Sequence, residues 1–207
     1  MSLGAADNTA VNPMQSTNGH GGPVSAVPSA GQTPPEVQII NAVQSRIATP
    51  EVIKAARGMS HFGEHALGWV GIAAAGWLVD KPRRRQWAGV AVGAVGAHAA
   101  SIVIKRIVRR PRPNDPSVQV NVSTPSKLSF PSSHATSTTA AAVLLGRLTG
   151  LPLPAVLVPP MLLSRVVLGV HYPSDVLAGS ALGAASAAAV LAAEKRLDDR
   201  RTRKSLR

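Results

Sequence analysis

The segment "QWAGVAVGAVGAHAASIVI", residues 86–104, contains no charged side chain. A helix needs about 20 mostly apolar residues to cross a bilayer, so this segment is long enough to span a membrane. Its closely spaced Gly and Ala residues favour tight packing against neighbouring helices inside a membrane. Only 3% of the residues in the chain are aromatic, which argues against a large water-soluble core.

Four further segments lack a charged side chain: residues 66–79, 135–146, 148–164 and 176–193. Of the five segments in chain order, the second, fourth and fifth reach the spanning range of about 17 to 25 residues, namely 86–104, 148–164 and 176–193. The other two reach it only with flanking residues. Five such segments leave a soluble bundle almost no polar face. We therefore predict an all-α fold, an integral membrane bundle of about five transmembrane helices.

The ends of the chain differ from this apolar part. Residues 1–35 are rich in Gly, Pro, Ser, Thr and Asn and lack Lys and Arg, which predicts a disordered tail and no cleavable signal peptide. Apolar residues recur at helical spacing over 36–60, which predicts an amphipathic helix with a break near Thr49-Pro50. We expect a membrane domain over 36–195 and a basic cytoplasmic tail over 196–207.

Polar residues interrupt the apolar segments at three places: "KRIVRRPRP" (105–113), "PSSH" (131–134) and "HYPSD" (171–175). If each apolar segment crosses the membrane once, all three clusters face the same compartment. We therefore expect residues that are distant in the sequence to meet in one site.

Together the clusters supply the groups needed for phosphoryl transfer. His134 and His171 titrate near neutral pH, and Asp175 can hold an imidazole in one tautomer. No pair or trio of carboxylates that could bind a metal accompanies them, so we expect neither a metal nor another cofactor. Three fixed positive charges are suited to phosphate oxygens, those of Lys105, Arg112 and Arg165.

These residues resemble the signature of the type-2 phosphatidic acid phosphatase superfamily, which includes vanadium haloperoxidases. Its three parts are Lys, six residues, Arg-Pro; Pro-Ser-Gly-His; and Ser-Arg, five residues, His, three residues, Asp. Here they read Lys105 with Arg112-Pro113, Pro131 to His134, and Ser164-Arg165 with His171 and Asp175.

The resemblance implies a role for each matching residue. His171 attacks phosphorus, Asp175 orients His171, and His134 protonates the leaving oxygen. Ser133 stands where the family most often has Gly, a residue that tolerates unusual backbone angles and permits close approach. The phosphate-binding residues implied are Lys105, Arg112, Arg165, Ser132 and the backbone amide of Ser133.

A site at a membrane surface favours a lipid phosphate as substrate. The chain is similar to the decaprenylphosphoryl-5-phosphoribose phosphatases of mycolic-acid bacteria in its compact size, its Ala- and Arg-rich composition and its segment "HFGEHALGWV" (61–70). That similarity implies that the enzyme removes the 5-phosphate of decaprenylphosphoryl-5-phosphoribose and leaves decaprenylphosphoryl-ribose, a step in arabinan precursor synthesis. A polyprenyl diphosphate or phosphatidylglycerol phosphate phosphatase and a non-enzymatic lipid-binding membrane protein remain alternatives.

The remaining charges predict the orientation. Twelve Lys and Arg residues lie on the side opposite the clusters and seven on the side of the clusters. The positive-inside rule then places the active site outside the cytoplasm. Arg106, Arg109 and Arg110 are expected to face anionic lipid head groups or water. The basic C-terminal segment is interpreted as a solvated flank, so we expect the bilayer and no nucleic acid as partner; the oligomeric state is not determined.

Overall fold

The computed structural model describes residues 33–205, so most of the predicted N-terminal tail lies outside the described residues. The described chain is all-α, as predicted, and each of the five uncharged segments lies largely in a separate helix. The elements are α1 (Pro35–Ile47), α2 (Pro50–Gly63), the short 3₁₀ helix η1 (Glu64–Ala66), α3 (Leu67–Val79), the 3₁₀ helix η2 (Lys81–Arg83), α4 (Arg84–Val108), α5 (Ser133–Thr149), α6 (Leu153–Val167) and α7 (Pro173–Ser205).

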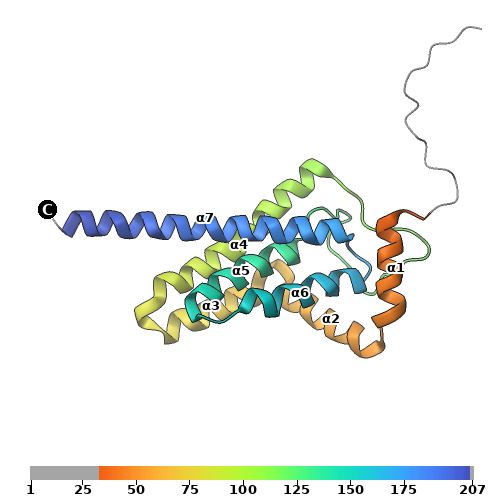
Figure 1. The fold of residues 1–207 in the computed structure, drawn as a ribbon, viewed down its shortest axis with the longest axis horizontal. Helices are drawn as coiled ribbons and strands as arrows, with labels where there is room; N and C mark the ends of the chain where they lie inside the picture. Colours follow the sequence, from red (N-terminus) through yellow and green to blue (C-terminus); the bar gives the residue numbers. More distant parts are fainter. Residues whose placement is uncertain (1–32, 206–207) are drawn as a thin grey trace, which may run out of the picture. The chain divides into compact units, whose positions relative to one another are not determined.

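Helix α5 occupies the middle of the bundle, where it contacts α4, α6 and α7 (Figure 1). Small residues allow this close packing. A Cβ atom added at Gly179 of α7 would lie 2.6 Å from the carbonyl oxygen of Ser132. Further along the same contact, the hydroxyl oxygens of Thr139 and Ser180 are 3.0 Å apart. The small residues of the last apolar segment therefore serve helix packing, as their spacing indicates.

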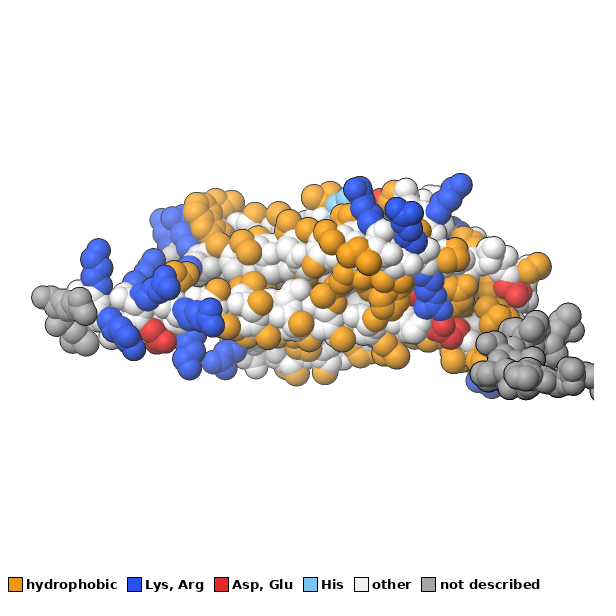
Figure 2. Space-filling model, turned by 90° about the horizontal axis from the view of Figure 1, so that it is seen from above, with side chains coloured by type: hydrophobic (Ala, Val, Ile, Leu, Met, Phe, Trp, Pro, Cys, Tyr) orange, Lys and Arg blue, Asp and Glu red, His pale blue; other side chains and the backbone are white. Residues whose placement is uncertain are grey.

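The outer surface of the bundle carries large apolar side chains. Val79 is 85% exposed, Ile107 74% and Leu67 65%. Figure 2 shows a band of hydrophobic and uncharged side chains between two groups of Lys and Arg. In the described part of the chain, two helical stretches are long and apolar enough to cross a membrane, Lys81–Val108 and Pro173–Lys204. Helices α3, α5 and α6 have 13, 17 and 15 residues, which is below the length of about 20 that a full crossing needs.

The predicted amphipathic helix is indeed two helices with a break at Thr49-Pro50. Thr49 caps α2, because its hydroxyl accepts a hydrogen bond of 3.3 Å from the backbone of Val52. Helix α1 buries Val37 and Ile40 in a cluster with Val166 of α6 and Val176 of α7. This packing brings the first turn of α1 close to the segment that joins α6 to α7.

Candidate active site

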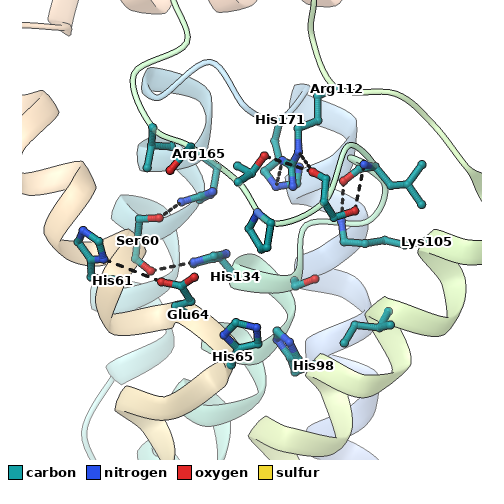
Figure 3. Close-up of a pocket in the computed structure, with 18 of the residues that line it drawn as sticks. Ser60, His61, Glu64, His65, His98, Lys105, Arg112, His134, Arg165 and His171 are labelled. Atoms are coloured by element: carbon teal, nitrogen blue, oxygen red, sulfur yellow. Dashed lines mark hydrogen bonds and ion pairs between the residues drawn. The ribbon is translucent and has the colours of Figure 1, made fainter.

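The three polar clusters meet at one end of the bundle, as the sequence predicts. They line a cavity of about 570 Å³ (Figure 3). Asp175 and Ser132 are fully buried beside it. The other predicted site residues are all in the cavity lining, namely Lys105, Arg112, Ser133, His134, Arg165 and His171.

Among the cations that line this cavity, three belong to the predicted site, and none of the three has an acidic partner in the described part of the chain. Arg165 is 1% exposed and Lys105 7%. Arg165 donates a 2.8 Å hydrogen bond from Nη1 to the Ser60 hydroxyl, but its buried Nε has no hydrogen-bond partner among the residues that the structure describes. Within residues 33–205, neither these two residues nor Arg112 forms an ion pair with a carboxylate. Because buried charges are costly unless they are paired, this arrangement is suited to an anionic ligand.

Arg112 is the cation that contacts the predicted nucleophile. Its Nη1 donates to the carbonyl oxygen of Val170 at 2.7 Å and lies 3.1 Å from His171 Nε2. Burial lowers the pKa of Arg112 to about 10, partly offset by the charge of Asp175. The guanidinium therefore keeps its charge at neutral pH.

Lys105 organises the start of α5. Its Nζ donates hydrogen bonds of 2.9 and 2.7 Å to the carbonyl oxygens of Ser129 and Pro131. Ser132 then caps the helix, with its hydroxyl 3.4 Å from the backbone nitrogen of Ala135. The N-terminus of α5, with Ser133 in the first turn, lies at the cavity wall. Free amides at a helix N-terminus favour an anion, which adds to the positive field.

His171 lies between α6 and α7 and is 2% exposed. Since Arg112 can only donate, Nε2 of His171 must be the acceptor, which leaves the proton on Nδ1. Nδ1 points at Asp175 Oδ2 from 3.5 Å, longer than a good hydrogen bond. Burial lowers the pKa of His171 well below its usual value, and the charges of Arg165 and Arg112 lower it further. The ring is thus neutral, as a nucleophile must be.

His134 lies against the end of α2. Its Nε2 is 2.9 Å from the carbonyl oxygen of Ser60, so this nitrogen carries a proton. Close packing holds the ring in place, because a Cβ atom added at Gly63 would lie 2.8 Å from His134 Cδ2. Sequence reasoning missed Ser60 and Gly63, since neither belongs to the signature.

Arg110 corrects one expectation from the sequence. Its guanidinium is only partly exposed and is held by two carboxylates, because its Nη1 donates a 2.9 Å hydrogen bond to Asp175 Oδ1 and its Nη2 pairs with Glu36. Its guanidinium also lies 4.0 Å from the ring centre of Tyr172. Glu36 in turn accepts a 3.0 Å hydrogen bond from the backbone of Ser174. A chain of contacts therefore joins α1 to the buried carboxylate behind His171.

The fold and the site together define a helical protein with a basic anion site at one end. A family model described as the PAP2 superfamily, the type-2 phosphatidic acid phosphatases, matches residues 86–198. Decaprenylphosphoryl-5-phosphoribose phosphatase of Mycobacterium tuberculosis is 59% identical over 156 residues, which are 75% of this chain and 88% of the relative. The enzyme of the same name from Mycolicibacterium smegmatis is 61% identical over 145 residues, 70% of this chain and 81% of the relative.

Two solved structures share the fold. The transmembrane PAP2 type phosphatidylglycerolphosphate phosphatase from Bacillus subtilis has a TM-score of 0.61 and 22% identity, covering 77% of this chain and 86% of that one. Aquifex aeolicus LpxE has a TM-score of 0.62 and 17% identity, covering 75% and 93%.

The chain belongs to the PAP2 superfamily. It is a membrane protein and a phosphatase. This finding favours the predicted enzyme over the alternative of a non-enzymatic lipid-binding membrane protein, which the sequence left open.

Proposed function

We propose that this protein removes the 5-phosphate from decaprenylphosphoryl-5-phosphoribose and releases decaprenylphosphoryl-ribose for arabinan precursor synthesis. The observation that carries the proposal is the cavity with three cations that lack acidic partners, next to a buried neutral histidine. The high identity to two phosphatases named for this substrate supports the choice of lipid.

The proposed reaction has two steps. Nε2 of His171 attacks phosphorus, and the bond from phosphorus to the ribose oxygen breaks. His134 keeps its Nε2 proton hydrogen-bonded to the Ser60 carbonyl, carries a second proton when the phosphate is bound, and donates that proton from Nδ1 to the ribose oxygen. Water activated by His134 then attacks the phosphohistidine, which releases inorganic phosphate and restores both rings. Asp175 stabilises the positive charge that His171 acquires. Splitting one displacement into two steps and stabilising the charge on the phosphoryl group both lower the barrier.

The phosphate site explains the choice between the two phosphates of this lipid. Lys105, Arg112 and Arg165 can surround the three unshared oxygens of a terminal monoester, with the N-terminus of α5 and its residues Ser132 and Ser133 completing the site. An internal diester presents two unshared oxygens and carries substituents on both sides. The phosphodiester is therefore expected to remain intact.

We propose further that the bundle of α3 to α7 is embedded in the cell membrane, with α4 and α7 long enough to span it, and that the active site faces away from the cytoplasm. At the opposite end of the bundle, two contacts bring the basic start of α4 to the ends of α5 and α7. Arg83 donates to the carbonyl oxygen of Leu148 at 3.1 Å, and Arg85 pairs with Asp198 at 2.5 Å. The basic end of α7, from residue 196, lies at the same end of the bundle. By the positive-inside rule this end faces the cytoplasm.

The substrate is tested with protein purified in detergent, in the presence of a chelator. Phosphate release from decaprenylphosphoryl-5-phosphoribose should be faster than release from a polyprenyl diphosphate or phosphatidylglycerol phosphate at fixed phospholipid composition. A tenfold higher kcat/KM for the polyprenyl diphosphate, equal to about 1.4 kcal/mol, would reverse the substrate assignment.

The nucleophile is tested in the same preparation. His171→Ala should form no phosphoenzyme, whereas His134→Ala should slow release of the ribose oxygen by about 10²- to 10⁴-fold and spare a substrate with a good leaving group. An active His171→Ala protein would contradict the mechanism.

A further inference from the structure

The cavity contains a second group of polar side chains beyond the three cations. Glu64 and His65 come from η1, and His98 comes from α4. Figure 3 shows these three residues on the side of His134 away from Arg165 and His171. None of them belongs to the three-part signature. A volume of about 570 Å³ is typical of sites that enclose a whole small molecule, so there is room for more than a phosphoryl group.

The polar atoms of this group have capacity to bind a ligand. Nδ1 of His98 is buried and has no hydrogen-bond partner within the described part of the chain. The carboxylate of Glu64 is 3.9 Å from His61 Nδ1, too far for a hydrogen bond, and its side chain is 44% exposed. Buried polar atoms are normally paired, so the orphan nitrogen of His98 calls for a partner from outside the chain.

The backbone that carries His65 is unusual. His65 has φ 51° and ψ 23°, and the next residue, Ala66, has φ 61°. Two successive residues other than glycine rarely adopt this left-handed conformation, and such strain is concentrated at sites that bind ligands. The turn places the His65 ring 5.8 Å from the His98 ring, between centroids.

The position of His134 decides which part of the substrate reaches this group. The inference rests on the proposed function, in which His134 protonates the leaving oxygen. A general acid must lie within hydrogen-bond distance of that oxygen. The leaving group therefore lies beside His134, next to Gly63 and the residues that follow it in η1.

We infer that Glu64, His65 and His98 form a hydroxyl subsite that binds neighbouring hydroxyl groups of a sugar leaving group. A carboxylate accepts hydrogen bonds from ribose hydroxyls in nucleotide sites, and an imidazole nitrogen can donate or accept according to its tautomer. A ribose substituted at positions 1 and 5 retains hydroxyl groups at positions 2 and 3. Recognition of this pair distinguishes a sugar phosphate from an alkyl phosphate or a diphosphate.

The test uses two soluble head-group analogues, methyl ribofuranoside 5-phosphate and its 2,3-dideoxy counterpart. The wild-type protein should prefer the diol by about tenfold in kcat/KM. Glu64→Gln should lower kcat/KM for the diol by about tenfold and for the dideoxy compound less than twofold. His65→Asn, which tolerates the left-handed backbone, should act in the same direction. Glu51→Gln, an exposed position on α2, is the matched control for loss of one negative charge and should change neither value.

Unchanged turnover of the dideoxy compound shows that each variant is folded. Equal losses for both analogues in Glu64→Gln, or a wild-type protein that does not distinguish them, would overturn the hydroxyl subsite. The lipid comparison above is independent of this result. Failure to release phosphate from decaprenylphosphoryl-5-phosphoribose overturns the proposed function, whereas release from that lipid without a preference for the diol analogue overturns the subsite alone.

Discussion

Arg110 offers the sharpest test of how the catalytic carboxylate is held. Arg110→Gln removes the charged hydrogen bond to Asp175 Oδ1, the pairing with Glu36 and the stacking on Tyr172. Asp175 is fully buried, so it loses a partner that water replaces poorly. Because the Arg110 side chain is 27% exposed, some solvent can enter, and the expected cost is that of one charged hydrogen bond, about 1.5–3 kcal/mol.

That cost should appear mainly in kcat, because Arg110 holds Asp175 and not the phosphate. A loss of about 1.5–3 kcal/mol in the transition state corresponds to roughly 10- to 150-fold in rate. Arg109→Gln, an exposed position next to it, removes the same charge and should change kcat less than twofold. Arg110→Lys should recover only part of the rate, since an ammonium group lacks the planar fork that reaches both carboxylates.

The assay is phosphate release by Arg110→Gln, by Asp175→Asn and by the double variant. If Arg110 acts through Asp175, its loss should cost little once the carboxylate is gone, so the two effects should be strongly non-additive. Additive effects, or a wild-type rate in Arg110→Gln, would refute this reasoning. Thermal unfolding of the same proteins separates a loss of positioning from a loss of folded protein.

Two further predictions concern His134 and His171. Gly63→Ala should displace the His134 ring, since the new Cβ atom would lie 2.8 Å from His134 Cδ2, and should lower kcat about tenfold or more. Gly58→Ala on the same helix is the control, because its Cβ atom meets no atom within 4 Å, and it should keep full activity. Equal activities of the two variants would argue against tight packing at His134. Burial lowers the pKa of His171, so the folded state resists protonation while the unfolded chain takes up a proton near pH 6.5. The contribution of His171 to stability is therefore present above about pH 6.5 and declines as the pH falls below it. Thermal unfolding between pH 7.5 and 5.5 should show a larger loss for the wild type than for His171→Gln, and equal losses would contradict a buried neutral ring.

The sequence was sufficient for the helices and for the signature residues. The charge-free segments indicate helices through their hydrophobicity, and Pro50 after Thr49 marks a helix start through its restricted backbone. Both are local properties that can be read from the sequence. His134 and His171 were assigned because they match the family signature, and counting crossings predicted that their clusters lie on the same side. Helix lengths were less predictable, since the ends of α3 and α6 depend on how the neighbouring turns pack.

Only the tertiary structure distinguished Arg110 from Arg109. Adjacent arginines carry the same charge, and their different roles arise because α1 brings Glu36 to one of them. The same holds for His98, the one titratable side chain of residues 86–104, which becomes notable only when η1 places His65 beside it. The sequence by itself indicated an all-α protein and, through the resemblance of its three polar clusters to the family signature, the candidate reacting groups, because composition and residue spacing are visible without a fold. The contacts that orient those groups join residues far apart in the chain, so they were decided by helix packing alone.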